Sequence, residues 1–204
     1  MEKVLFGSKK LQEALDKGFV VSFPTETVYG LGIRWDSYQG FLNLASVKHR
    51  SVSKPVSVMC GRNFDFDKYF YISSGIKRVI DTFLPGPLTI LLKAKGNVPW
   101  QTHLGTDVVG IRVPDSPKLL DFLDSLPYPL QVTSANIASE PPLTDFNEVY
   151  YKFKNEELIR YIVNFDSPNS KIPTTIVSFA DNNIKMIREG EIRLEAVMKV
   201  YKGE

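Results

Sequence analysis

The sequence has very few of the side chains on which metal and thiol chemistry depend. Cys60 is the only cysteine among 204 residues, so the chain can form neither an internal disulfide nor a thiolate cluster. His49 and His103 are the only histidines, and neither has a second ligand at metal-binding spacing. The sequence therefore predicts no metal site made of protein ligands, no Ser-His-Asp triad, and a reducing cytoplasmic setting.

Long apolar runs and the common phosphate-binding signatures are absent too. No stretch approaches the roughly 20 apolar residues of a membrane helix, and residues 1–4 lack the layout of a signal peptide. Neither a Walker A sequence nor a Gly-x-Gly-x-x-Gly sequence occurs, so a nucleotide site of those kinds is excluded. The net charge of +2 permits an anionic ligand or RNA without demanding either. We expect a cytoplasmic protein with no membrane partner.

Hydrophobic periodicity predicts strands that alternate with helices. Expected helices begin after Ser8, occupy residues 41–48, begin after Ser73 or Ser74, begin at Ser116-Pro117, and occupy residues 191–201. Expected strands are 19–23, 56–59, 88–92, 108–113, 130–133, 161–163, 174–177 and 184–187. This pattern predicts one α/β domain over residues 1–204 with a substantial sheet, and it leaves the strand order open.

Polar residues follow directly where the first expected strand ends. Pro24 cannot donate to a sheet ladder, so pairing should stop there. Thr25, Glu26 and Thr27 come next, and two glycines shortly after them allow the backbone to bend or approach a ligand. A plain strand-to-helix loop would have the same composition. For Glu26 we expect a structural role, because nothing in the sequence marks it as a base.

Other cations and hydroxyls also lie just beyond expected strand or helix ends. Ligands often bind outside the strand ends of open α/β sheets, and such side chains suit phosphate and carboxylate groups. The candidates are Thr25, Thr27, Lys48, Arg50, Lys54, Arg112, Ser134, Asn136, Thr174, Thr175 and Arg188. 

Each candidate also has an ordinary structural interpretation. Lys48 and Arg50 could simply complement a helix C-terminus, which contributes up to about 1 kcal/mol. Arg112 could form a surface ion pair. The Ser134 and Asn136 side chains could cap a turn, and Arg188 could belong to another turn.

Seven segments in this order resemble the YrdC/TsaC family of threonylcarbamoyl-AMP synthases. Residues 23–32 resemble its opening motif, Lys48-His49-Arg50 its Lys-x-Arg signature, and Ser134-Ala135-Asn136 its Ser-x-Asn signature. The other segments are 85–89, 109–114, 173–177 and 187–192. The resemblance covers most of the chain and is to the single-domain form of the family. Single segments are weak signals, whereas seven in order are strong.

The resemblance implies a twisted mixed sheet flanked by helices around a positively charged cavity. It implies a nucleotidyltransferase that makes threonylcarbamoyl-AMP and pyrophosphate from L-threonine, bicarbonate and ATP. The product feeds the threonylcarbamoyladenosine (t6A) modification of tRNA, through transient contact with a downstream transferase. By motif position, Thr27, Arg112 and Thr174 would hold threonine. The ATP site would comprise Lys48, Arg50, Lys54, Ser134, Asn136 and Arg188, with Lys48 and Arg50 taking the catalytic role and Mg²⁺ arriving on the nucleotide.

The chain departs from the family pattern at several positions. Thr174-Thr175 replaces a common Ser-Thr, and Lys54 stands where many members have Asn. Met59, Val108 and Pro142 replace His, Thr and Ser, so side-chain contacts with ligand are in doubt at these three positions.

Two other functions remain open at this stage. A non-catalytic RNA-binding module could use the same basic concave surface, although a net charge of +2 predicts only weak, salt-sensitive RNA binding. Carbamoyl transfer in hydrogenase maturation uses a related domain, but those chains carry zinc-binding cysteines and this chain has one cysteine.

Overall fold

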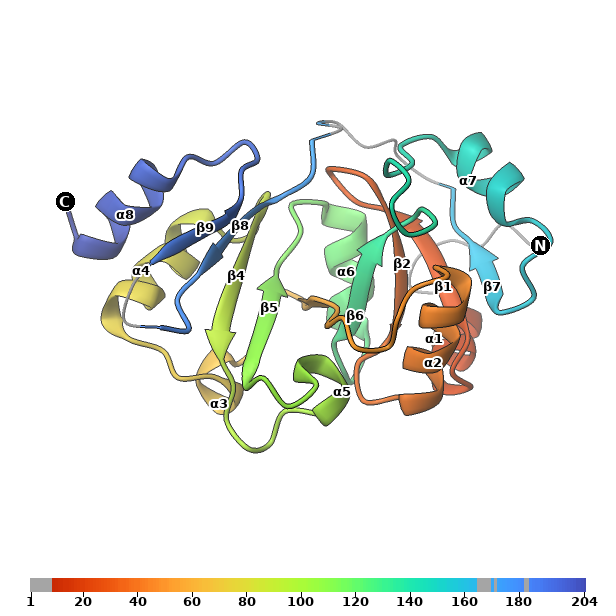
Figure 1. Ribbon diagram of the computed structural model, residues 1–204, viewed down its shortest axis with the longest axis horizontal. Coiled ribbons are helices and arrows are strands. Elements are labelled where there is room, and N and C mark those ends of the chain that lie inside the picture. Colours follow the sequence, from red (N-terminus) through yellow and green to blue (C-terminus); the bar gives the residue numbers. More distant parts are fainter. Residues whose placement is uncertain (1–8, 165–169, 171, 182–183) are drawn as a thin grey trace.

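The computed structural model describes residues 9–164, 170, 172–181 and 184–204. Within these ranges nine strands form one mixed sheet in the order β7-β1-β2-β6-β3-β5-β4-β8-β9, flanked by eight helices (Figure 1). The strands are β1 Val20–Pro24, β2 Tyr29–Arg34, β3 Val58–Met59, β4 Leu88–Lys93, β5 Val108–Arg112, β6 Leu130–Ser134, β7 Ile159–Ile162, β8 Thr175–Ser178 and β9 Lys185–Arg188. The helices are α1 Lys9–Asp16, α2 Tyr38–Val47, α3 Phe66–Tyr69, α4 Ser74–Phe83, α5 Trp100–His103, α6 Pro117–Ser125, α7 Phe146–Phe153 and α8 Leu194–Lys202.

The expected α/β class is confirmed, and most predicted elements lie within a few residues of their predicted positions. Ser73 caps α4 by accepting from the Ile76 N–H, as predicted. The expected Ser8 cap lies outside the described residues. Sequence reasoning missed β2, α3, α5 and α7. Two of these helices are single turns, and α7 begins at an Asp145 cap soon after Pro141 and Pro142.

The stretch after β1 is a hairpin and not a strand-to-helix loop. Pro24 is paired with Tyr29 at the last position of an antiparallel ladder, so pairing stops at this proline, as predicted. Proline lacks only the N–H, and at the last ladder position that loss is tolerated. Gly30 and Gly32 lie inside β2. A Cβ at Gly32 would be 2.7 Å from the ring of Phe23, so a larger residue would not fit there. The glycines therefore make room for a core side chain.

The sheet separates two apolar clusters. Tyr29, Leu31 and Ile33 alternate along β2 toward the cluster that α2 and α7 cover. Helices α1, α4 and α6 contribute to the larger cluster, which contains Phe23 and Ile111. Burial on both sides fixes the register of the central strands, because a slip of one residue would exchange the two faces. No helix in the described part of the chain is both long and apolar enough to cross a membrane.

Candidate active site

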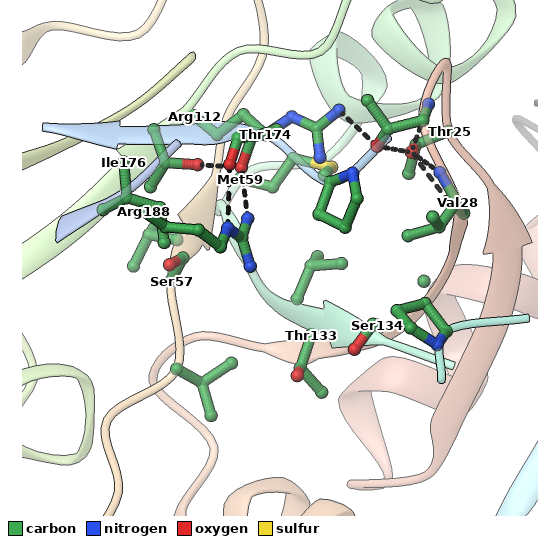
Figure 2. Close-up of a pocket in the computed structure, with 18 of the residues that line it drawn as sticks. Thr25, Val28, Ser57, Met59, Arg112, Thr133, Ser134, Thr174, Ile176 and Arg188 are labelled. Carbon is green, nitrogen blue, oxygen red and sulfur yellow. Dashed lines mark hydrogen bonds between the residues drawn. The ribbon is translucent and has the colours of Figure 1, made fainter. Parts of the chain in front are cut away.

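A polar pocket of about 180 Å³ is lined by residues of strands β2, β3, β4, β5, β6, β8 and β9. It is bounded by the β1–β2 turn, the ends of β3, β5, β6 and β9, and the starts of β4 and β8. In Figure 2, Arg112, Thr174 and Arg188 line one side, and Thr133 and Ser134 lie across the open space. Seven of the candidate residues contribute to the lining: Thr25, Thr27, Arg50, Arg112, Ser134, Thr174 and Arg188.

The β1–β2 turn presents Thr27 to Arg112. The Thr25 hydroxyl donates to the Val28 carbonyl at 2.8 Å and accepts the N–H groups of Thr27 and Val28, which fixes the turn. Arg112 Nη2 then donates to Thr27 Oγ1 at 3.1 Å and lies 2.6 Å from Glu26 Oε1. Arg112 ends β5, and its side chain is almost fully buried. The arginine is thus positioned by the sheet on one side and by the turn on the other.

A second hydroxyl and guanidinium unit joins β4, β8 and β9. Arg188 Nε donates to the Thr174 carbonyl and its Nη2 to Thr174 Oγ1, both at 2.9 Å. Thr174 Oγ1 lies 2.9 Å from Thr89 Oγ1, which also lines the pocket. Burial, with the nearby charge of Arg112 as a smaller cause, lowers the pKa of Arg188. The two arginines are therefore close enough for their charges to interact.

The cations Lys48, Arg50 and Lys54, which the resemblance assigns to the ATP site, do not lie together around the pocket. Arg50 contributes to the lining, and its Nη2 donates to the carbonyls of Lys54 and Pro55. Lys54 is exposed, and among the described residues it is not part of the lining. Lys54 contacts the pocket residue Arg50 through its peptide carbonyl and not through its ammonium. Of these three cations, Arg50 alone belongs to the lining that the described residues form.

Lys48 is buried behind the pocket, where it fixes the end of β6. Its Nζ donates to the Ser134 carbonyl at 2.6 Å, to the Asn136 carbonyl at 3.0 Å and to Asn136 Oδ1 at 2.7 Å. Asn136 Oδ1 also accepts from Ser134 Oγ, and its Nδ2 donates to Glu140 O. Burial, with Arg50 as a smaller cause, lowers the pKa of Lys48 from 10.5 to about 8. Lys48 and Asn136 thus shape the turn, and neither is part of the lining formed by the described residues.

The positions that depart from the family pattern do not share one environment. Met59 and Pro142 line the pocket, whereas Val108 begins β5 at the other end of the strand. Thr174 faces the pocket, but the hydroxyl of Thr175 exchanges hydrogen bonds with the backbone of Ile192. The neighbouring threonines therefore have different tasks.

Sequence reasoning missed three hydroxyls of the lining: Ser57, Thr89 and Thr133. Thr89 lies in the predicted strand 88–92, where its apolar neighbours indicated only a buried strand. No local signal separates Ser57 or Thr133 from ordinary strand residues. Only the strand order brings these hydroxyls to the same space.

The described lining is cationic in composition. Arg50, Arg112 and Arg188 contribute to it, and no Asp or Glu does so among the residues whose placement is described. Several hydroxyls surround the guanidinium groups. Such a set of donors suits anionic oxygen atoms of phosphate and carboxylate groups.

Comparison with known proteins identifies the family. Residues 13–190 match the Sua5_yciO_yrdC family, which is described as "Telomere recombination". The chain belongs to this family. It is 32% identical to a protein of Methanocaldococcus jannaschii that is provisionally named threonylcarbamoyl-AMP synthase, over 94% of this chain and 91% of that protein. It is 30% identical to the threonylcarbamoyl-AMP synthase of Vibrio cholerae, over 72% of this chain and 82% of that protein.

Solved structures of the family share the fold. Sua5 of P. abyssi in complex with L-threonine has a TM-score of 0.84 and is 26% identical, over 94% of this chain. The present chain spans 56% of that Sua5 chain. E. coli YciO has a TM-score of 0.80 at 22% identity, over 91% of this chain and 90% of that chain. The expected twisted mixed sheet with flanking helices is thus the fold of this family.

Proposed function

We propose that the protein is an L-threonylcarbamoyladenylate synthase, which forms threonylcarbamoyl-AMP and pyrophosphate from L-threonine, bicarbonate and ATP. The observation that carries the proposal is a pocket, in a chain of this family, that is lined by three arginines and several hydroxyl groups. The nucleophiles would be the amine of threonine and the carbamate oxygen. The protein would need to position the reactants and stabilise negative charge, without a nucleophile of its own.

Within the pocket, the two guanidinium units would divide the substrates. Arg112 and Thr27 would hold the carboxylate and hydroxyl of threonine, with Thr174 completing that site. Arg50, Arg188 and Ser134 would contact ATP. Lys48 and Asn136 would act by holding Ser134, with which both share hydrogen bonds. Lys54 would act by holding Arg50 through its carbonyl.

Mg²⁺ would be held mainly by the phosphates of the nucleotide. The described lining offers hydroxyl groups and no carboxylate, and Mg²⁺ on a nucleotide needs few protein ligands. The product would pass to a tRNA threonylcarbamoyl transferase, and contact with RNA itself would be weak. Residues 1–204 would form one catalytic domain.

The direct test is the release of pyrophosphate from ATP. Release should require L-threonine and bicarbonate together, and omission of either should abolish it. Equal release without threonine would contradict the proposed function. Tight, salt-resistant tRNA binding without ATP consumption would instead favour a non-catalytic RNA-binding protein.

The hydroxyl groups also predict amino-acid selectivity. A site built to hydrogen-bond a substrate hydroxyl rejects the analogue that lacks it, because buried polar groups are then left unpaired. Valine, which replaces the hydroxyl with a methyl group, should support less than about 1% of the turnover seen with threonine. Comparable turnover with valine would show that Thr27 and Thr174 do not read the side chain.

A further inference from the structure

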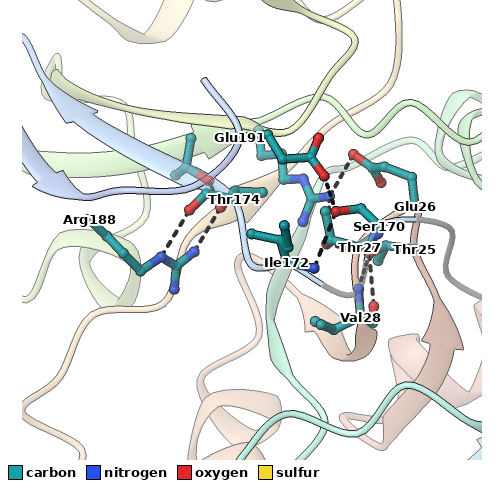
Figure 3. Close-up of polar contacts among 11 residues, drawn as sticks. Thr25, Glu26, Thr27, Val28, Ser170, Ile172, Thr174, Arg188 and Glu191 are labelled. Carbon is teal, nitrogen blue, oxygen red and sulfur yellow. Dashed lines mark hydrogen bonds and ion pairs between the residues drawn. The ribbon is translucent and has the colours of Figure 1, made fainter. Parts of the chain in front are cut away.

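The three arginines of the pocket differ in the groups that they contact. Arg50 donates to the carbonyls of Lys54 and Pro55, and Arg188 donates to the carbonyl and hydroxyl of Thr174. Both sets of acceptors are neutral. Arg112 is the one that pairs with a carboxylate among the described residues, through Glu26. Figure 3 shows Glu26 on the same turn as Thr25 and Thr27.

Glu26 lies outside the pocket lining but against Arg112. The side chains of Glu26 and Arg112 are only 10% and 11% exposed, and the Oε1–Nη2 distance is 2.6 Å. Thr25 and Thr27, on either side of Glu26, both line the pocket. The backbone turn therefore directs two hydroxyls into the pocket and the intervening carboxylate against Arg112.

The pair leaves hydrogen-bonding capacity unused. Neither carboxylate oxygen of Glu26 receives a well-aligned hydrogen bond, although Oε1 is within ion-pair distance, and Arg112 Nε has no acceptor among the described residues. A pair that served only to stabilise the fold would be expected to satisfy these atoms, because unpaired buried polar groups are costly. The ion pair with Glu26 therefore neutralises the charge of Arg112 and leaves the Nε–H group of Arg112 without an acceptor among the described residues.

This arrangement gives the pocket two electrostatic regions. Arg50 and Arg188 keep uncompensated charge, whereas Arg112 together with Glu26 is formally neutral. Polyphosphate binding gains most from uncompensated cations. An amino acid carries both a carboxylate and an ammonium, so it needs N–H donors for the first and no excess of positive charge around the second.

We propose that Glu26 reserves Arg112 for the amino-acid substrate by lowering its attraction for phosphate groups and by fixing its guanidinium beside Thr27. Glu26 acts through Arg112 and is therefore a positioning and specificity-determining residue. This inference rests on the proposed function, because it takes the ligand of Arg112 to be threonine.

The test compares two ligands that should respond in opposite directions. L-threonine binding is measured by calorimetry, with inorganic phosphate as competitor, for the wild-type chain, Glu26→Gln, Glu26→Asp and Asp36→Asn. Glu26→Gln should weaken threonine about tenfold and strengthen phosphate about tenfold, because each change corresponds to a charge interaction of about 1.4 kcal/mol. Glu26→Asp keeps the charge and should recover much of the selectivity.

Asp36→Asn is the matched control. It removes a carboxylate from Arg34, which lies at the other end of β2 from the pocket. Neither threonine nor phosphate affinity should change. A shift as large as that of Glu26→Gln would show that loss of any carboxylate has this effect, and would overturn the inference.

The outcomes separate the inference from the proposed function. Absence of threonine binding to the wild-type chain would contradict the proposed function. Normal threonine binding by Glu26→Gln, or an equal weakening of both ligands, would overturn the role of Glu26 and leave the function standing. If Glu26→Gln does not fold, the wild-type chain still decides: competitive displacement of threonine by phosphate would overturn the inference, and resistance to displacement would support it.

Discussion

Two arginines near opposite ends of strand β2 are held in different ways: Arg34 belongs to β2 itself, and Arg112 ends β5. At the end away from the pocket, Arg34 donates Nε and Nη2 to Asp36 and Nη1 to Asp16. Its guanidinium also lies 4.2 Å from the ring centroid of Tyr128, whose hydroxyl donates to Asp16. At the pocket end, Arg112 contacts Thr27 and Glu26 through one terminal nitrogen, and its Nε has no acceptor among the described residues.

Arg34 and Arg112 both face carboxylates, but they differ in how many of their N–H donors have an acceptor. Arg34 has carboxylate acceptors at three of its nitrogens, so little capacity remains for a ligand. Arg112 is more deeply buried yet less saturated, and a ligand that brings acceptors can bind without breaking an existing fork. Unused donors, rather than the presence of an arginine, therefore distinguish the candidate site from a surface ion pair.

The largest expected effect is the difference in turnover between alanine variants of Arg112 and Arg34. Arg112→Ala should lower kcat/KM for threonine about a thousandfold, because two charged hydrogen bonds at roughly 1.5–3 kcal/mol each are lost. Arg34→Ala should leave turnover within about twofold and lower the melting temperature by a few degrees. Pyrophosphate release and thermal unfolding of both variants provide the measurements. Similar losses of turnover in the two variants would remove the distinction between the ends.

A smaller difference in ATP use is expected between variants of Arg50 and Lys54. Arg50→Ala should weaken ATP use about tenfold to a hundredfold, and Arg50→Lys should recover only part, because a single ammonium cannot replace the guanidinium fork. Lys54→Ala keeps the carbonyl that holds Arg50 and should retain near-normal turnover. Titration of ATP at saturating threonine measures both. Normal turnover in all three variants would leave Arg50 with a structural role only.

A pH-dependent effect is expected from Lys48. Because its pKa is lowered to about 8, Lys48 loses its proton above that pH and has fewer N–H groups for its three oxygen acceptors. ATP turnover should therefore fall by up to about tenfold per pH unit above pH 8. Turnover of Lys48→Met, measured over the same range, should be low and lack this decline. A wild-type profile that stays flat to pH 9.5 would contradict the role of the ammonium.

Loss of the Lys48 proton, which should lower turnover, should raise the stability of the fold. Between pH 8 and 10.5 the unfolded chain keeps the Lys48 proton that the folded chain has lost, so this group makes the free energy of unfolding rise with pH. Denaturant unfolding of the wild-type chain and Lys48→Met at pH 7.5 and 9.5 measures the difference. A wild-type stability that falls relative to the variant would show that the folded state holds this proton more tightly than the unfolded state.

Local sequence predicted the parts of the fold that depend on local physics. Ser73 identified the start of α4, and the apolar run 88–92 identified most of β4, since capping and burial patterns are properties of neighbouring residues. The glycines of β2 did not indicate a strand. Gly32 makes room for the ring of Phe23 on β1 and Gly30 for Val132 on β6, and no local pattern contains these neighbours.

The sequence by itself determined the chemical types in the candidate site: several cations and hydroxyls at the ends of predicted strands, in a chain with very few imidazole or thiol groups. Only the tertiary structure decided their roles. Strand order placed Arg50, Arg112 and Arg188 around one pocket, buried Lys48 behind it, and left Lys54 outside. Side chains far apart in the chain become neighbours through β-ladder pairing and packing, and local sequence does not encode which of their donors remain unused.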